Sequence, residues 1–340
     1  MLYPIYNYSL GCHFFCLFFM NYQLNFKMNY STFFYPFNYP ALAVVTILYA
    51  INTVQNVQYV MRLFAEIHSQ MTSAERTLAY TKLNAEKGRD AKNKPPSGWP
   101  RTGTIQFKNV SLSHYEGGPN ILRNLSFDIK STEKIGIAGR TGAGKSSLVA
   151  ALMQMAETDG EIIVDDVNIT KFNVVSYRGS ISVIPQSPTL INGSLRLNLD
   201  PFYMFTDMEI WHALDQMQMK SIISSLPEQL ETVITDGGSS FSVGGKQLLH
   251  LARVVLKKSK IILFDEATAK VDKETVEKVQ RIIPNVFKDC TVITITHQLS
   301  TILECDRIMV LDCGELVEFD KPENLLAKED GVLKQMYRMT

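Results

Sequence analysis

The chain of 340 residues is long enough for one large or two ordinary domains, and with 46% hydrophobic and 20% charged residues most of it can bury a core. A formal net charge of +0 argues against a nucleic-acid-binding surface as its main function. The cysteines are odd in number and lack metal-ligand spacing, which suits a reducing compartment without a disulfide framework. They are Cys12, Cys16, Cys290, Cys305 and Cys313.

Residues 1–40 differ in composition from all that follows, because they are rich in Tyr, Phe and Asn. Their most apolar run, residues 14–20, has no Lys or Arg before it and so lacks the basic start of a signal peptide. The run is of marginal length for a membrane span. Three interpretations stay open: a membrane-associated segment, the remnant of a longer protein, or a stretch with no defined fold.

Residues 41–65 begin with an apolar run and continue with polar residues among apolar ones. The length suits a membrane-spanning helix, in which Asn52, Gln55 and Asn56 would have to face other helices or a water-filled pathway. On hydropathy alone, a soluble amphipathic helix is an equal alternative. We expect the helix to extend toward the cytoplasm as far as residue 84.

Residues 85–100 are charged and then rich in Pro and Gly, which predicts a linker and a domain boundary. From residue 101 to 340 the pattern becomes that of an α/β domain. A helical stretch is expected from about 207 to 230. Strands are predicted at 104–110, 121–129, 134–138, 160–165, 180–184, 260–265, 291–296 and 307–311.

A glycine-rich stretch at residues 139–147 fits the phosphate-loop pattern G-x-x-x-x-G-K-[ST]. It lies between the predicted strand 134–138 and a predicted helix at 147–153, so its backbone N–H groups and the helix N-terminus can surround nucleotide phosphates. Lys145 would reach the β- and γ-phosphates, and Ser146 would offer its hydroxyl to Mg²⁺. The predicted ATP-binding loop is Gly139, Arg140, Thr141, Gly142, Ala143, Gly144, Lys145, Ser146 and Ser147.

Two carboxylates end the apolar run 261–265 and extend just past it. Ligands of open α/β sheets lie at the carboxyl ends of the strands, so Asp265 can hold Mg²⁺ there. Glu266, one residue further, can orient or deprotonate an attacking water. A solvated strand end would be the simpler interpretation of this run alone, but the phosphate loop earlier in the same domain favours a nucleotide site.

With these residues in place, the chain resembles an ATP-binding-cassette (ABC) ATPase. Residues 101–340 carry six of the family's motifs in the family's order. Besides the phosphate loop, the matches are Asp-Glu-Ala-Thr-Ala at 265–269, the Q-loop glutamine Gln186, the signature at 241–247, the D-loop aspartate Asp272 and the switch histidine His297.

The resemblance implies a role for each matching residue. Gln186 would ligate Mg²⁺ together with Ser146 and Asp265, and would sense the membrane domain. Glu266 and His297 would be the catalytic residues. The signature, with Ser242, Val243, Gly244 and Gly245, would act in trans by capping the ATP that a partner domain holds.

Finer features are similar to the C subfamily, the multidrug-resistance-associated proteins. They are Phe-Ser-Val at 241–243, Asn-Leu-Asp-Pro-Phe at 198–202 and the sequence Gly-Arg-Thr-Gly-Ala-Gly of the phosphate loop at 139–144. The match is to the second, C-terminal cassette of the short, type-four-like members. Residues 70–76 resemble the segment that leaves the last membrane helix there, which favours a transmembrane helix at 41–65.

The chain departs from the family pattern at several positions. Gly245 stands where the signature normally has Gln, Lys270 where the D-loop has a small polar residue, and Gln298 where Arg commonly follows the switch histidine. The aromatic residue that stacks on adenine would be His114 or, with a shift of one position, Tyr115. Other histidines, His212 and His250, are expected to pack or face solvent and not to bind ligands.

The resemblance implies an α/β fold of the P-loop NTPase, ABC-type ATPase class. This is a mixed sheet with a helical subdomain, preceded by one or two membrane-type helices. The implied function is ATP binding and hydrolysis, with Mg²⁺, powering export of organic anions or xenobiotics across a membrane. Its partners would be a second nucleotide-binding domain and transmembrane domains, not nucleic acid, with this domain cytoplasmic. The alternative is a truncated or regulatory ATPase module without transport of its own.

Overall fold

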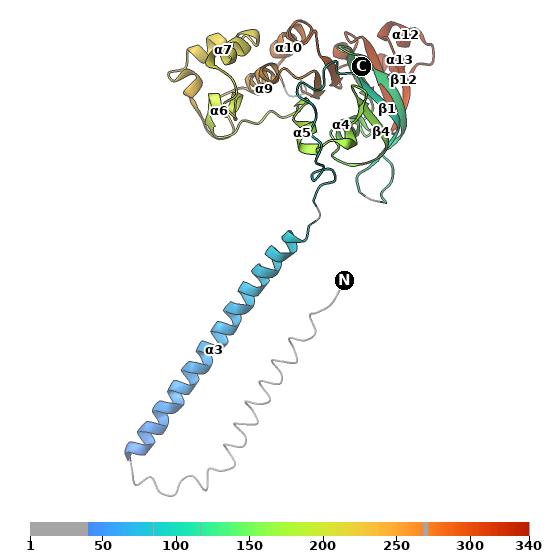
Figure 1. The fold of residues 1–340 in the computed structure, drawn as a ribbon. Coiled ribbons are helices and arrows are strands. Elements are labelled where there is room, and N and C mark those ends of the chain that lie inside the picture. The colour runs from blue at the N-terminus through green and yellow to red at the C-terminus, as the bar shows by residue number, and fades with distance from the viewer. Residues whose placement is uncertain (1–39, 84, 116, 268–270, 340) are drawn as a thin grey trace. The chain divides into compact units, whose positions relative to one another are not determined.

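The computed structural model describes residues 40–83, 85–115, 117–267 and 271–339 and divides the chain into two compact units, residues 1–84 and 85–340. Figure 1 shows a long helix in the first unit and an α/β domain in the second. The interpretations of residues 1–39 and of Lys270 therefore concern positions outside the described residues.

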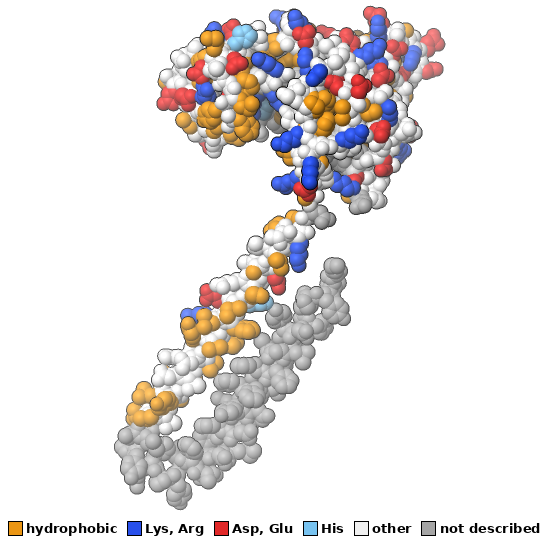
Figure 2. Space-filling view, in the orientation of Figure 1, with side chains coloured by type: hydrophobic (Ala, Val, Ile, Leu, Met, Phe, Trp, Pro, Cys, Tyr) orange, Lys and Arg blue, Asp and Glu red, His pale blue; other side chains and the backbone are white. Residues whose placement is uncertain are grey.

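The first unit contains α3 (Pro40–Thr81), which confirms a helix through the predicted region. Pro40 occupies the first position, where no N–H is needed, and no Gly or Pro follows within the helix. Its described side chains are exposed, and Figure 2 shows apolar ones along much of its length.

Across the described residues, no helix is long and apolar enough to cross a membrane. The prediction for residues 41–65 is therefore corrected in one respect: these residues form a helix, but that helix does not meet the requirement for a membrane-spanning one. Asn52, Gln55 and Asn56 interrupt the apolar run and lower the mean hydropathy of the described part.

The second unit is built on a six-stranded sheet with the order β12-β11-β3-β10-β9-β6. Five neighbouring strands are parallel, and β12 joins the edge antiparallel to β11. The apolar residues of the four central strands, β11, β3, β10 and β9, are buried on both faces, as is typical of parallel sheets. The strands are β3 (Lys134–Gly139), β6 (Ser182–Ile184), β9 (Ile261–Asp265), β10 (Thr291–Ile295), β11 (Arg307–Asp312) and β12 (Glu315–Asp320).

A second, antiparallel sheet has the order β2-β1-β4-β5. Its strands are β1 (Ile105–Ser113), β2 (Leu122–Ile129), β4 (Glu157–Val164) and β5 (Val167–Asn168). Helix α4 (Lys145–Leu152) contributes Leu148 and Leu152 to one core together with residues of both sheets. The mixed α/β class is thus confirmed, with the phosphate-loop helix in the main core.

Helices form a second core around α9 (Val243–Lys257). The stretch predicted as helical at 207–230 is in fact broken into α7 (Asp207–Gln216), α8 (Lys220–Ser224) and the short 3-10 turn η2 (Gln229–Glu231). Thr206 and Glu209 form a reciprocal capping box that begins α7. The remaining elements here are α6 (Leu195–Leu199), α10 (Lys273–Val286) and a small pair of strands, β7 (Gly193–Ser194) and β8 (Val233–Ile234).

The predicted linker at 85–100 packs on the domain. Glu86 pairs with Arg178, the last residue of α5 (Val174–Arg178), and this pairing lowers the pKa of Glu86. The Trp99 ring lies edge-on to Phe172 with centroids 4.9 Å apart. The linker residues thus belong to the second unit.

The C-terminal part was not predicted in detail. After β12 come α12 (Pro322–Ala327) and α13 (Val332–Met339). The buried carboxylate of Glu318 accepts hydrogen bonds from the N–H groups of Val332 and Leu333, both at 3.2 Å. This carboxylate satisfies N–H groups in the first turn of α13 that have no partner within the helix, and it joins that helix to the sheet.

Candidate nucleotide-binding site

The phosphate loop connects the end of β3 to the start of α4, as predicted. Gly142 (φ 83°) and Gly144 (φ 100°) lie in the left-handed region that favours glycine. A Cβ atom on Gly144 would also meet the Leu122 side chain at 2.7 Å. No side chain caps the N-terminus of α4, so its first amides remain available to an anion.

Lys145 is buried inside this loop, with 6% of its surface exposed. Its Nζ donates to the carbonyl oxygens of Gly139 at 2.8 Å and Arg140 at 3.0 Å. Burial lowers the pKa of Lys145, and the charge of Glu266 partly opposes that effect. The ammonium therefore lies within the loop, bonded to neutral acceptors that a phosphate oxygen could replace.

Two of the predicted side chains, His297 and Gln186, contact the predicted carboxylate Glu266. Its Oε1 lies 2.7 Å from His297 Nε2, and its Oε2 accepts a 2.7 Å hydrogen bond from Gln186 Nε2. These residues follow β9, β10 and β6, which are neighbours in the parallel sheet. The carboxyl ends of the three strands thus bring together residues from distant parts of the sequence.

Asp265 ends β9 one residue earlier and is half-buried. Burial raises the pKa of its carboxyl group, and the nearby charge of Glu266 raises it further. The backbone turns sharply after it, since Glu266 has a φ of 49° and its N–H donates to Ile295 O at 2.9 Å. Two adjacent carboxylates are therefore presented at one strand end, an arrangement that a divalent cation would stabilise.

A cavity of about 320 Å³ lies in front of the phosphate loop. Tyr115 is not among its lining residues: that side chain is 65% exposed and its ring lies beside Gly118. Of the two candidates for stacking on adenine, His114 is thus the one that faces the cavity. The lining residues are His114, Ile121, Thr141, Gly142, Gly144, Lys145, Ser146, Ser147, Glu266 and His297.

Ile121 is the one lining residue that the sequence analysis missed. It carries no chemical motif, and it precedes β2 of the antiparallel sheet. The site receives it because Arg123 N–H donates to Gly314 O and Gly314 N–H donates to Ala143 O, which join that sheet to the loop. Such a contact between distant segments leaves no sequence signal.

The signature residues begin α9 and do not line the cavity. The Ser242 hydroxyl accepts a 3.0 Å hydrogen bond from Gly245 N–H and so caps the helix. Gly244 is tightly enclosed, since a Cβ atom there would lie 2.7 Å from Thr275 Oγ1. Gly245 is open by comparison, with its nearest contact at 3.4 Å.

Asp272 is the N-cap of α10. Its carboxylate accepts from Thr275 N–H at 2.9 Å and from Thr275 Oγ1 at 3.0 Å, and these bonds lower its pKa. The same Thr275 hydroxyl faces Gly244, so the D-loop cap and the signature turn are in contact within one domain.

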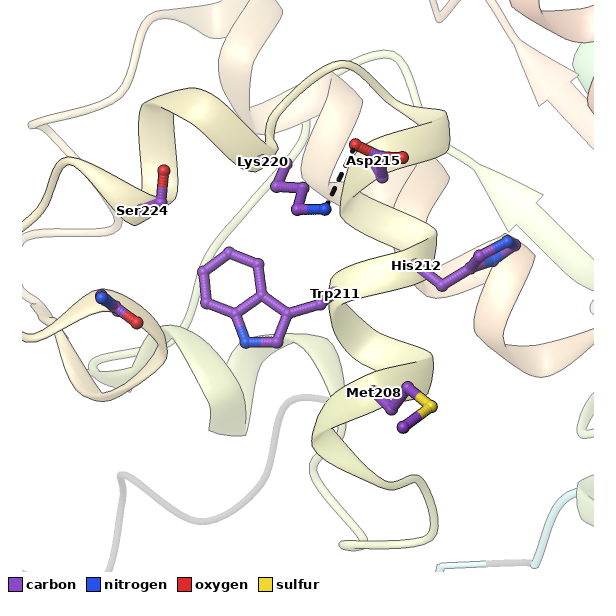
Figure 3. Close-up of a pocket in the computed structure, with 7 residues that line it drawn as sticks. Met208, Trp211, His212, Asp215, Lys220 and Ser224 are labelled. Atoms are coloured by element: carbon purple, nitrogen blue, oxygen red, sulfur yellow. Dashed lines mark ion pairs between the residues drawn. The ribbon is translucent and has the colours of Figure 1, made fainter.

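A second cavity, of about 540 Å³, lies on the helical part between α7, α8 and η2. Figure 3 shows Trp211 pointing into it and Lys220 directed toward Asp215, an ion pair of 3.8 Å. It contains none of the motif residues. His212 lines its edge, and His250 bonds to Thr189 O at 3.0 Å.

Comparison with known proteins gives consistent results. The protein-family model described as ABC transporter matches residues 122–269. The chain is 44% identical over 288 residues to ATP-binding cassette sub-family C member 4 of both Mus musculus and Homo sapiens, covering 85% of this chain and 22% of each relative. It is 42% identical over 289 residues to the probable multidrug resistance-associated protein lethal(2)03659 of Drosophila melanogaster, covering 84% of this chain and 21% of that one.

Among solved structures, the chain resembles a bacterial Atm1-family ABC exporter with ATP bound. The TM-score is 0.70 at 26% identity, over 86% of this chain and 51% of that one. The chain spans about a fifth of the length of the curated relatives it matches.

Proposed function

We infer that this chain belongs to the ABC transporter family, in its C subfamily, and we propose that it binds and hydrolyses Mg-ATP to power export across a membrane. The observation that carries the proposal is the meeting of Gln186 and His297 on the Glu266 carboxylate, at the edge of the phosphate-loop cavity. A structural ion pair would need neither a glycine-rich loop nor an uncapped helix beside it.

ATP would bind with its phosphates on the loop and its base against His114. The uncapped amides of α4 and the dipole of that helix would hold the phosphates. Lys145 would exchange its bonds to Gly139 O and Arg140 O for phosphate oxygens, which compensate its buried charge better than carbonyls do. The imidazole of His114 would supply a flat surface for the adenine.

The donor set around the loop fits Mg²⁺, which prefers hard oxygen ligands. Ser146 offers a hydroxyl, Gln186 an amide oxygen and Asp265 a carboxylate that would act through the surrounding shell. Burial and the neighbouring charge of Glu266 raise the pKa of Asp265, and a bound divalent cation would favour the charged carboxylate. The ion would supply charge neutralisation for the phosphates.

Glu266 would position and activate the attacking water. Its two oxygens contact separate side chains, Gln186 and His297, so the carboxylate has a defined direction. Gln186 would turn from Glu266 toward the metal, and His297 would turn toward the γ-phosphate. Catalysis would then depend mainly on positioning and electrostatics.

The signature of this chain would close on nucleotide held by a second cassette, because Ser242 and Gly244 lie outside the chain's own cavity. Gly245 lacks the amide that this position normally offers, so the partner site would be the weaker of the two. The transported substrates would be organic anions or xenobiotics. The membrane domains would belong to the rest of the transporter, with this domain on the cytoplasmic side.

A regulatory or truncated module is the second candidate. It is favoured by Gly245, which lacks the side-chain amide that this signature position normally offers. To separate the two, the full chain is assayed for Mg-ATP turnover alone and mixed with the N-terminal cassette of a C-subfamily relative. Turnover that rises on mixing supports the exporter. Bound ATP without turnover in any mixture supports the module.

A further inference from the structure

One face of α9 holds residues 185–198, the segment that contains the Q-loop glutamine Gln186. Three side chains spaced three residues apart, Gln247, His250 and Arg253, each bond to backbone oxygens of that segment. Their acceptors, Pro185 O, Thr189 O and Asn198 O, follow the same order along the chain. Arg253 also donates to Asn198 Oδ1 at 3.0 Å. Helix α9, which begins with the signature, is thus joined to the Q-loop segment by side-chain contacts at three positions.

The contact nearest the active site is also the weakest. Gln247 is 1% exposed, yet its Nε2 reaches Pro185 O at 3.5 Å, the long limit of a hydrogen bond. Its Oε1 has no hydrogen-bond partner among the described residues. An unmet buried acceptor is costly, so a small displacement of the Q-loop that improves these bonds is favoured.

Gln247 lies between the two functional ends of the domain. Toward the N-terminus of α9, about one and a half turns away, Ser242 caps the signature and would touch the partner's nucleotide. On the other side, Pro185 is bonded covalently to Gln186, whose amide donates to Glu266. A shift of α9 therefore reaches the Glu266 carboxylate through two hydrogen bonds, Gln247 to Pro185 O and Gln186 to Glu266, and the peptide unit between Pro185 and Gln186.

We propose that Gln247 is a positioning residue that couples the signature of this domain to its own catalytic carboxylate, so that nucleotide capped in trans sets the Gln186–Glu266 contact. This inference rests on the proposed function for the identity of the trans ligand. Coupling of this kind is reciprocal, so Q-loop displacement also alters the signature turn.

The first test uses backbone amide exchange at Gln186 and Ser187 in the full chain without nucleotide. Gln247→Met keeps the length and burial of the side chain and removes its donor. The matched control is Gln154→Met, because Gln154 Nε2 also donates to a backbone carbonyl, Ile169 O at 2.8 Å, away from the site. We expect faster exchange in Gln247→Met only. Equal exchange in both variants would overturn the proposal. If Gln247→Met fails to fold, Gln247→Asn retains the amide but cannot reach Pro185.

The second test measures coupling in a double-mutant cycle. Ser242→Ala removes the signature cap, and we expect it to change exchange at Gln186 in the wild-type background but not in the Gln247→Met background. An equal effect in both backgrounds would rule out a relay through Gln247. Neither exchange measurement depends on turnover. If the chain binds ATP without hydrolysing it, the proposed function is refuted, but the exchange results still decide whether Gln247 couples the signature to Glu266.

Once turnover is established, kinetics provide a third test. We expect kcat to fall about tenfold for Gln247→Met while the KM for ATP stays unchanged, because one buried hydrogen bond would then act only on the reacting geometry. A merely structural role would lower the unfolding midpoint and leave the kcat of the folded fraction unchanged.

Discussion

Gln186 and Glu266 are 80 residues apart in sequence, and their side chains are joined by a 2.7 Å hydrogen bond. The bond runs from the segment after β6 to the segment after β9, two adjacent strands of the parallel sheet. It connects the residue proposed to respond to the membrane domains with the residue proposed to activate water. Movement of the Q-loop thus has a direct physical route to catalysis.

We predict that His114 and not Tyr115 contributes to ATP affinity. His114→Ala removes the ring that faces the cavity, so the Kd for ATP rises about tenfold, a typical loss for one base–aromatic stack. Tyr115→Ala is the matched control and should leave the Kd unchanged, since that ring is exposed beside Gly118. Equilibrium binding of a fluorescent ATP analogue measures both. A larger loss with Tyr115→Ala would show that the base stacks one residue later.

The two signature glycines should differ in their tolerance of a side chain. Gly244→Ala places Cβ 2.7 Å from Thr275 Oγ1, which Asp272 holds in place, so overpacking costs about 1–3 kcal/mol of unfolding free energy. Gly245→Ala meets no atom closer than 3.4 Å, and it replaces Gly in the first turn of α9, so stability is unchanged or slightly higher.

Urea unfolding of the nucleotide-free chain compares these two variants directly. Because the space around Gly245 is open, we also expect Gly245→Gln to fold normally. The new side-chain amide restores the group that this signature position normally offers, so ATP hydrolysis at the partner site should increase. Equal destabilisation by both alanine substitutions would contradict the geometry of the signature turn.

Stability should depend on His250 below neutral pH. Burial lowers the pKa of His250, the bond to Thr189 O raises it less, and the facing charge of Arg253 lowers it. The unfolded chain therefore binds a proton at His250 more tightly than the folded chain does. The contribution of neutral His250 to the free energy of unfolding is fully present above its unfolded pKa of about 6.5, and it is lost as the pH falls through the lower pKa of the folded chain.

The unfolding midpoint should therefore decrease more for wild type than for His250→Gln between about pH 7.5 and 5.5. The glutamine keeps a donor near Thr189 O without titrating. Parallel midpoint curves for the two proteins would show that His250 does not carry this pH dependence.

Much of the site followed from local sequence. Strands at 134–138, 261–265 and 291–295 were predictable because parallel strands read as continuous apolar runs, and the chemical motifs follow them directly. Once the strands are parallel and adjacent, their carboxyl ends must converge. For Glu266 and His297 the common site was implied by the resemblance to the family, and the structure joins the two side chains at 2.7 Å.

Features set by contacts between distant segments were harder to predict. The break in the stretch predicted as helical at 207–230 has a local cause instead: Gln218 has a φ of 56° between α7 and α8, and Pro227 follows α8 and cannot continue a helix. The start of β4 at Glu157 carries no apolar signal, because its register is fixed by pairing with Ser113 of β1. The choice between His114 and Tyr115 depended on loop geometry that a one-residue shift would reverse.

The account depends most directly on Glu266. The decisive measurement is phosphate release from Mg-ATP by the full chain mixed with a second cassette, compared with the same mixture containing Glu266→Gln. The substitution keeps the size of the side chain and removes its basicity, so we predict that turnover falls by about 10²-fold or more while ATP still binds. Turnover that is unchanged by Glu266→Gln would contradict the proposed site.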